Sequence, residues 1–259
     1  MDFDFGVDLA ESAGGFTREN PKVGPHMARV RDILHIGTIG DSRYPDKKPT
    51  PRAVIVFELL EEHDVDSQGN RLLYPHMINM VKGDNSFLNS KFLPAVVSAE
   101  EFKAGSVKGF DDIITRPCQL ELTGSDQTYK DEKTGEELPK YINLGSITTL
   151  HPKLVQVLDP LAEGNLGHVR LADFKKDSLD ILNMFMHIQE GIMKSDEWKS
   201  GAHPAIPMIE EIRKERPNFA KAKSKDEAKG QGANGSGAQQ QQPQTGSAAP
   251  EKLDSDEEF

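Results

Sequence analysis

The chain has 259 residues, a formal net charge of −11, 36% hydrophobic residues and a single cysteine. One cysteine excludes an intramolecular disulfide and a thiolate metal cluster. The acidic first residues and the lack of an apolar run of about 20 residues argue against a signal peptide and a membrane span. We therefore expect a soluble protein of one or two domains in a reducing compartment.

The negative charge is concentrated at the two ends of the sequence. Residues 1–15 hold four acidic and no basic residues, and residues 251–259 hold five acidic residues and one lysine. Between these ends, residues 18–52 contain eight Lys or Arg against four acids, and residues 213–229 contain seven against three. Basic windows of this kind can follow a phosphate backbone, or they can simply keep a surface solvated. Both readings stay open at this point.

The sequence predicts five strands with a helical insert after the third. Strands are expected where β-branched, aromatic or alternating apolar residues concentrate, over residues 26–36, 52–60, 71–81, 117–123 and 141–149. Short helices are expected over residues 87–93 and after a capping box formed by Ser98 and Glu101. Two later helices are expected, one capped by Asp177 and Ser178 and one over residues 205–216.

Alternation within the predicted strands indicates which side chains are buried. In the first strand, Ala28 and Val30 are expected on one face, with Arg29 and Arg31 exposed on the other. Glycines 37 and 40 are expected to interrupt this strand. Cys118 is expected as a small buried residue of the fourth strand.

The order of three strands, a helical insert and two strands is that of an OB-fold, a five-stranded Greek-key barrel. We therefore expect a mainly β fold class with helical additions, although a small β-sandwich shares the strand count. The expected parts are a flexible acidic arm, an OB-fold domain, a helical extension packed on the barrel, a disordered Gly/Gln linker and an acidic tip ending in Phe. Their boundaries are 1–15, 16–160, 161–220, 221–250 and 251–259.

No catalytic motif is visible, and we expect no enzyme activity, no cofactor and no metal. The chain lacks a phosphate-binding P-loop and a nucleophile elbow, and its eight histidines show no paired metal-ligand spacing. Aromatic and basic residues are instead interleaved, as in proteins that stack bases on aromatic rings and hold phosphates with cations. Candidate stacking residues are Tyr44, Tyr74, Phe87, Tyr129 and Tyr141. Candidate phosphate contacts are Arg29, Arg31, Arg43, Lys47, Lys48, Arg52, Arg71, Lys82, Lys91 and Lys140.

The acidic tip has the chemistry of a docking segment. Its carboxylates can pair with Lys or Arg of a partner, and the terminal aromatic ring can fill an apolar pocket. A purely solubilising tail has no use for that ring. The docking residues are expected to be Asp254, Asp256, Glu257, Glu258 and Phe259.

Residues 25–149 resemble the OB-type single-stranded DNA-binding proteins of tailed bacteriophages. The resemblance rests on residues 26–37, 52–60, 87–92 and 110–122, and on the Gln-rich linker with its acidic tip. Glu258 holds the place where the commonest bacterial tip has proline.

The resemblance implies a protein that binds single-stranded DNA without strong sequence preference and protects it. It also implies recruitment of replication, recombination or repair proteins (a polymerase, helicase or nuclease) in the cytoplasm of an infected bacterial host. A homodimer is compatible with this role. The alternative is an OB-fold interaction scaffold or virion-associated protein that binds protein rather than DNA.

Overall fold

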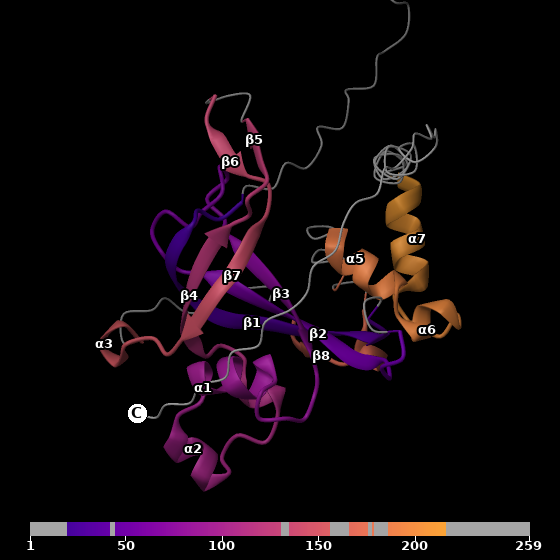
Figure 1. The fold of residues 1–259 in the computed structure, drawn as a ribbon, viewed down its shortest axis with the longest axis horizontal. Coiled ribbons are helices and arrows are strands. Elements are labelled where there is room, and N and C mark those ends of the chain that lie inside the picture. The colour runs from indigo at the N-terminus through magenta and orange to yellow at the C-terminus, as the bar shows by residue number, and fades with distance from the viewer. Residues whose placement is uncertain are drawn as a thin grey trace, which may run out of the picture. The chain divides into compact units, whose positions relative to one another are not determined.

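The structure is a computed structural model (Figure 1) and describes residues 20–41, 45–130, 135–155, 166–175, 178 and 186–215. The chain divides into a unit that ends at Lys214 and a second unit from Glu215 to Phe259. The elements described here lie in the first unit, apart from the last residue of the final helix. The predicted acidic arm, Gly/Gln linker and acidic tip lie outside the described residues.

The fold is mainly β with helical additions, as the sequence predicts. The strands are β1 (Gly24–Ile39), β2 (Thr50–Leu59), β3 (Leu73–Asn79), β4 (Pro117–Gly124), β5 (Thr128–Lys130), β6 (Glu137–Pro139), β7 (Ile142–Thr148) and β8 (Gly167–Val169). The helical segments are η1 (Leu88–Phe92), α1 (Leu93–Val96), α2 (Ala99–Ala104), η2 (Phe110–Ile113), α3 (Pro152–Val155), η3 (Leu171–Asp173), α5 (Met186–Met193), α6 (Asp196–Lys199) and α7 (Ile206–Glu215). Among the described helices, none is long and apolar enough to cross a membrane.

One antiparallel sheet contains the five long strands in the order β3-β2-β1-β4-β7, with β8 added parallel to β1. The predicted strands at residues 52–60, 71–81, 117–123 and 141–149 correspond to β2, β3, β4 and β7. β3 and β7 are the two edges, and no ladder joins them in the described part of the chain, so the sheet is unclosed there. The edge position of β3 explains how Pro75 is tolerated within it, because an edge strand has backbone groups that need no ladder partner.

β1 is a long, irregular strand that pairs with different strands along its length. Its first residues pair with β4 up to Arg29, and residues 32–34 pair with β8. Irregularities in its register with β2 fall between Val30 and Asp32 and again between His35 and Gly37. Such bulges bend a strand. The expectation that Gly37 interrupts β1 is wrong, because its φ of 101° fits the second bulge and the strand continues to Ile39.

The central strands β1 and β2 are buried on both faces. Along β2, Ala53, Ile55 and Phe57 point into one apolar core, shared with β3, β4 and the helical insert. The alternate residues Val54 and Val56 point into a second core, shared with the helices after β8. An unbroken apolar run is the pattern expected of a strand covered on both sides, and it explains the composition of residues 53–57.

The helices α5 and α7 cover the outer face of β1, β2 and β3. Ile188 and Ile192 of α5 and Ile209 of α7 are fully buried in the second core. The approach is close at Gly191, where an added Cβ would lie 2.9 Å from Met77 Cε of β3. The sequence predicts α7 over residues 205–216, close to its observed bounds, whereas most of the earlier predicted helix lies outside the described residues.

The insert between β3 and β4 closes one end of the first core. Its capping box is confirmed: Ser98 Oγ accepts from Glu101 N at 3.2 Å, and Glu101 Oε2 accepts from Ser98 N at 2.9 Å. Phe92 packs edge-on against Phe57, with 6.2 Å between ring centroids. Cys118 of β4 is also fully buried, as predicted, and burial raises the pKa of its thiol.

A charged pair is enclosed between β1 and β2. Arg29 and Glu58 are directly opposite in the ladder, and Arg29 Nε donates to Glu58 Oε2 at 2.5 Å. Arg29 is 5% exposed and Glu58 is 1% exposed. The expectation that Arg29 is exposed is therefore wrong, because the face opposite Ala28 and Val30 is covered as well.

Replacing Glu58 by Gln removes the negative charge opposite a buried guanidinium and keeps the shape of the side chain. We expect the free energy of unfolding to fall by about 3–5 kcal/mol, because an uncompensated buried charge is costly. Urea unfolding measures this. The double variant Arg29→Met/Glu58→Leu is the matched control and should regain most of the loss. A Glu58→Gln protein within about 1 kcal/mol of the wild type would contradict this account.

Candidate nucleic-acid interface

Two of the predicted stacking residues lie on the surface, one within the β5–β6 hairpin and one between the hairpin and β7. Tyr129 is 43% exposed and Tyr141 is 54% exposed. Tyr129 lies in the short strand β5. Exposed aromatic faces of this kind can stack unpaired bases.

Backbone contacts fix the hairpin to the end of β4. Tyr129 pairs with Leu138 in the ladder, and at the base of the hairpin Lys140 N donates to Gln127 O at 2.7 Å. A Cβ on Gly124 would lie 2.8 Å from Pro139 Cβ, so this close approach of the two segments requires glycine. The position of Tyr141 is therefore set by β4 and β7.

Two exposed lysines accompany these tyrosines. Lys140 Nζ lies 5.4 Å from the centroid of the Tyr141 ring, within cation–π range. Lys130 is exposed beside Tyr129 and was not among the predicted phosphate contacts, although its place one residue after Tyr129 is visible in the sequence. The exposed acids Glu136 and Glu137 follow on the same hairpin, so its tip is not strongly basic.

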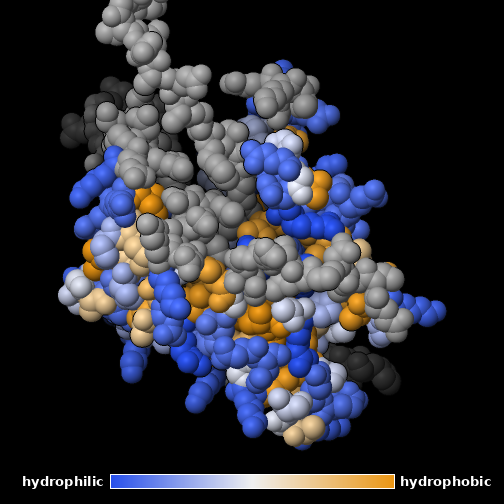
Figure 2. Space-filling view, turned by 180° about the vertical axis from the view of Figure 1, so that it is seen from behind, coloured by the Kyte–Doolittle hydropathy of each residue, from blue (hydrophilic) through white to orange (hydrophobic). Residues whose placement is uncertain are grey.

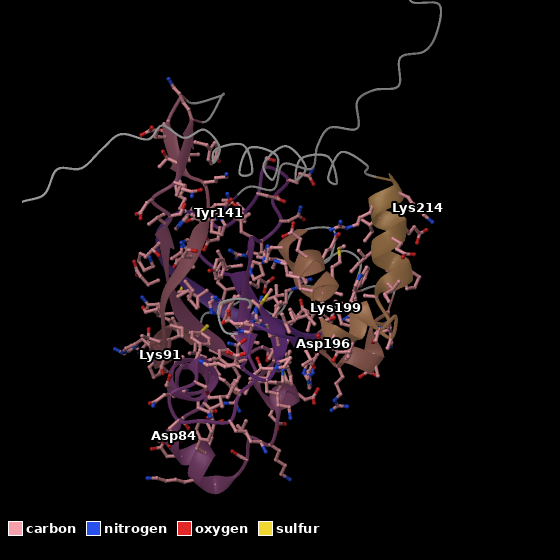
Figure 3. The ribbon with its side chains drawn as sticks, turned by 45° about the vertical axis from the view of Figure 1, so that its right-hand side comes forward. Asp84, Lys91, Tyr141, Asp196, Lys199 and Lys214 are labelled. Carbon is pink, nitrogen blue, oxygen red and sulfur yellow. The ribbon has the colours of Figure 1, made fainter. Side chains whose placement is uncertain are left out.

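Lys91 lies at the other end of β7. It is exposed on η1, which packs beside β7. Thr149 Oγ1, just after β7, donates to Pro94 O at 3.2 Å and ties the strand to the insert. Lys91 and Tyr141 lie on the same side of the ribbon, below and above one another (Figure 3). We call Lys91, Tyr129, Lys130, Lys140, Tyr141 and the exposed edge of β7 the β7 edge surface.

Two other predicted stacking residues are not available. Tyr74 is 6% exposed in the first core, because alternation along β3 points it inward with Ile78. Its assignment as a stacking residue is wrong. Phe87 is half-buried, and its ring packs against the His76 ring with 4.8 Å between centroids. Tyr44 lies outside the described residues.

Four of the arginines that were predicted to contact phosphates are buried or half-buried and make contacts within the protein. Arg29 is paired with Glu58, and Arg31, expected on the surface, has a side chain only 13% exposed, 3.7 Å from Asp32 Oδ2. Arg52 is half-buried, with Nη1 directed at the Met77 sulfur. Arg71 Nη1 donates to Glu61 O at 2.8 Å.

Two of the remaining predicted cations, Lys47 and Lys48, are exposed but lie on another part of the molecule. Lys47 and Lys48 follow the end of β1, which contacts α6 through a hydrogen bond from Thr38 N to Glu197 Oε2 at 2.7 Å. α6 and the β5–β6 hairpin lie at opposite corners of the ribbon (Figure 1). Lys82 is exposed after β3. Arg43 and the five tip residues Asp254, Asp256, Glu257, Glu258 and Phe259 lie outside the described residues.

On the reverse face, hydrophobic side chains are visible between projecting hydrophilic ones (Figure 2). The large exposed hydrophobic residues of the described chain are spread over several elements: Val23, Val65, Val81, Phe102, Tyr129, Tyr141, Leu154 and Val155. Scattered residues of this kind are ordinary on a protein surface, so the paired tyrosines and lysines distinguish the β7 edge surface.

Comparisons with protein-family models, curated proteins and solved structures found no match to this chain. The function is therefore argued from its own residues.

Burial beside Phe87 makes His76 a source of pH dependence, because burial lowers the pKa of His76 to about 4. The unfolded chain takes up this proton near pH 6.5, whereas the fold excludes it. The contribution of His76 to the free energy of unfolding is therefore fully present above pH 6.5 and is lost as the pH falls toward 4. We expect His76→Leu to reduce the loss of unfolding free energy between pH 7 and pH 5 by about 2 kcal/mol.

Urea unfolding at the two pH values measures this difference. His151 is exposed, so His151→Leu should keep the pH dependence of the wild type. An unchanged pH dependence in the His76 variant would show that the buried imidazole is not its source.

Proposed function

We propose that this protein binds single-stranded DNA along the β7 edge surface, with little sequence preference. The observation that carries the proposal is the pairing of two exposed tyrosines with nearby lysines on an exposed sheet edge. Bases stack on aromatic rings with about 1–3 kcal/mol each, and lysines can hold the phosphates between them. β7 has seven residues and spans about 23 Å, enough to follow several nucleotides.

We also propose that the sheet is an OB-fold opened between its third and fifth strands. Two observations support this. The long strands have the order β3-β2-β1-β4-β7, which becomes the cycle of a five-stranded barrel if β3 and β7 are joined. The helical insert also lies between the third and fourth long strands.

The proposed DNA path differs from the common one. OB-folds usually bind oligonucleotides on the face of strands two and three. Here α5 and α7 pack on the outer face of β2 and β3, through Val54, Val56 and Leu73. The exposed edge at β7 remains accessible. Because Glu136 and Glu137 lie close to it, stacking should contribute more to affinity than charge does.

The acidic tip is proposed to recruit the proteins that act on the DNA, in the replication and recombination of a bacteriophage. Its support comes from the sequence, with carboxylates at Asp254, Asp256, Glu257 and Glu258 next to the terminal aromatic Phe259. A linker of about 30 residues has a root-mean-square span of roughly 27–33 Å if it is a flexible coil. A tip on such a linker can reach a partner beyond the bound strand.

A protein-binding scaffold is the second candidate. It is favoured by the same edge, because no described strand pairs with the outer side of β7, and an extended peptide could pair there as a further strand. It is also favoured by the helices that cover the usual OB-fold ligand face. In this reading the tyrosines would contact a partner protein and DNA would not bind.

A fluorescence titration of labelled oligo-dT separates the two candidates. We expect binding whose affinity falls with salt, with a log–log slope near −0.7 for each phosphate contact. Tyr141→Ala should weaken it by about 5- to 150-fold, the loss of one stacked base. Phe102→Ala is the matched control, because Phe102 is an equally exposed aromatic (47%) on α2, and it should bind like the wild type.

Two outcomes of this titration would contradict the DNA proposal. No binding at low salt would exclude the DNA proposal and leave the scaffold. Equal losses for the Tyr141 and Phe102 variants would refute the β7 edge surface as the path.

Phe259→Ala should bind oligo-dT normally and lose capture of a tip-dependent polymerase, helicase or nuclease.

A further inference from the structure

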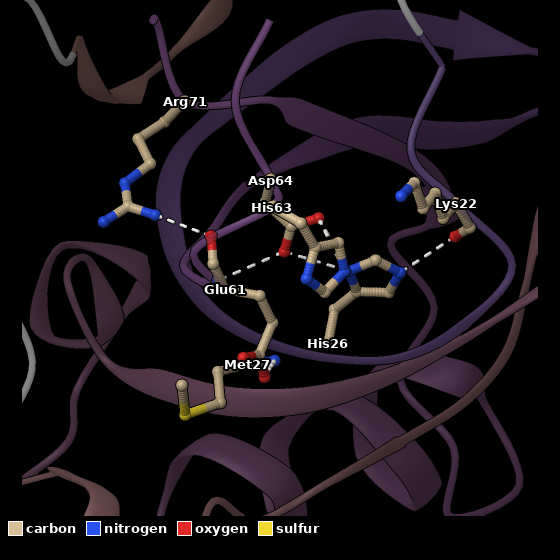
Figure 4. A network of polar contacts seen from close by, with 7 residues as sticks. All are labelled: Lys22, His26, Met27, Glu61, His63, Asp64 and Arg71. Atoms are coloured by element: carbon tan, nitrogen blue, oxygen red, sulfur yellow. Dashed lines mark hydrogen bonds and ion pairs between the residues drawn. The ribbon is translucent and has the colours of Figure 1, made fainter.

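A cluster of histidine and carboxylate side chains lies where β1 begins, far from the β7 edge surface in sequence. His26 is the third residue of β1, and His63 and Asp64 follow β2 in a turn. His26 and Asp64 are buried and His63 is exposed, and one potential ligand atom from each lies within 4.8 Å of the other two. Figure 4 shows the three side chains converging.

One hydrogen bond fixes the tautomer of His26. Its Nε2 lies 2.8 Å from the Lys22 carbonyl oxygen, which can only accept, so Nε2 carries a hydrogen and donates it. Histidines that bind metals commonly donate their second ring N–H to a carbonyl in this way. The other nitrogen, Nδ1, is therefore directed at Asp64.

Nδ1 of His26 lies 2.9 Å from the Asp64 carboxylate. A lone pair on Nδ1 and a carboxylate oxygen would repel one another at this distance unless a positive charge lies between them. Only a proton or a metal ion can supply that charge at such a separation. Either a proton or a metal ion can therefore be held by His26 Nδ1 and the Asp64 carboxylate.

The Asp64 carboxylate places one oxygen, Oδ1, next to both imidazoles. Oδ2 accepts from Glu61 N at 3.1 Å, which holds the group in place. Oδ1 is buried and lies 2.9 Å from His26 Nδ1, and no further hydrogen bond to it comes from the described residues. It faces His63 Nε2 at 3.9 Å. A buried carboxylate oxygen that faces two imidazole nitrogens can share a cation with them.

We propose that His26 Nδ1, His63 Nε2 and Asp64 Oδ1 form a binding site for a divalent transition metal of the zinc class. Two imidazoles and one carboxylate are ligands that Zn²⁺ prefers, whereas Ca²⁺ and Mg²⁺ favour all-oxygen sites. Tetrahedral bonds of about 2.0–2.1 Å place ligand atoms about 3.3 Å apart. His63 has a side chain 49% exposed, and a small rotation brings it into range, with water as the fourth ligand.

The site would act as a clamp on the fold. It joins the first residues of β1 to the turn between β2 and β3, and Glu61 adds a second tie by accepting from Met27 N at 3.2 Å. A metal that binds the folded but not the unfolded chain raises stability by mass action. This site could not be recognised in the sequence, because His26 is brought to His63 and Asp64 only by the pairing of β1 with β2.

Isothermal titration of the full-length, chelator-treated protein with Zn²⁺ tests the proposal, with the visible absorption of bound Co²⁺ as a second readout. We expect one ion per chain, a rise in melting temperature and Co²⁺ bands of tetrahedral type. His63→Ala should weaken binding by at least about tenfold, and it should still fold because its side chain is half-exposed. His151→Ala, at an exposed histidine outside the cluster, should bind like the wild type.

The proposal is overturned if the wild type binds neither metal at micromolar concentrations. It is also overturned if the His63 and His151 variants bind alike, which would assign the ion to another place on the surface. Neither result bears on oligo-dT binding, so this test is independent of the proposed function.

Discussion

The burial of β1 and β2 on both faces is the constraint on which the rest of the molecule depends. One face of these strands closes the first core with β3, β4 and the insert, and the other supports α5 and α7. A sheet with two covered faces leaves little room for charged side chains on its central strands, because an unpaired buried charge is costly. Arg29 and Glu58 therefore pair with each other, and Asp32 accepts from the backbone of Leu166 and Gly167, which holds β8 against β1. Burial raises the pKa of Asp32, despite the nearby Arg31 and these amides.

The same constraint decides where a ligand can bind. If the sheet is an opened OB-fold, as proposed, the helices occupy the face on which such a fold usually binds its strand. The exposed tyrosines lie at the edge of the sheet instead. Tyr129 is exposed within a short hairpin that projects beyond β4 and β7, and Tyr141 is exposed where this hairpin joins β7; both lie outside the two cores. The arginines that composition suggested as phosphate contacts are largely held inside, which leaves lysines as the exposed cations near these rings. An interface of this kind depends on stacking and tolerates many sequences.

Local features of the fold were predictable from sequence because they depend on neighbouring residues. The capping box at Ser98 and Glu101 needs only a spacing of three, and the strand positions follow from β-branched runs and alternation. Long-range features were not. Alternation placed Arg29 on a solvated face, but helices more than a hundred residues later in the chain cover that side of the sheet. In the sequence, Tyr74 cannot be distinguished from a surface aromatic residue. Its pairing with Phe57 in the ladder places it over the core. The proximity of His26 to Asp64 likewise exists only once β1 and β2 are paired.

The central claim, that the β7 edge surface and not the helix-covered face receives DNA, is tested most directly by hydrogen exchange followed by mass spectrometry, with and without oligo-dT. The account predicts slower exchange on DNA binding in β5, β6, β7 and η1, and unchanged exchange in α5 and α7. Slower exchange confined to α5 and α7, or to the outer face of β2 and β3, would contradict it.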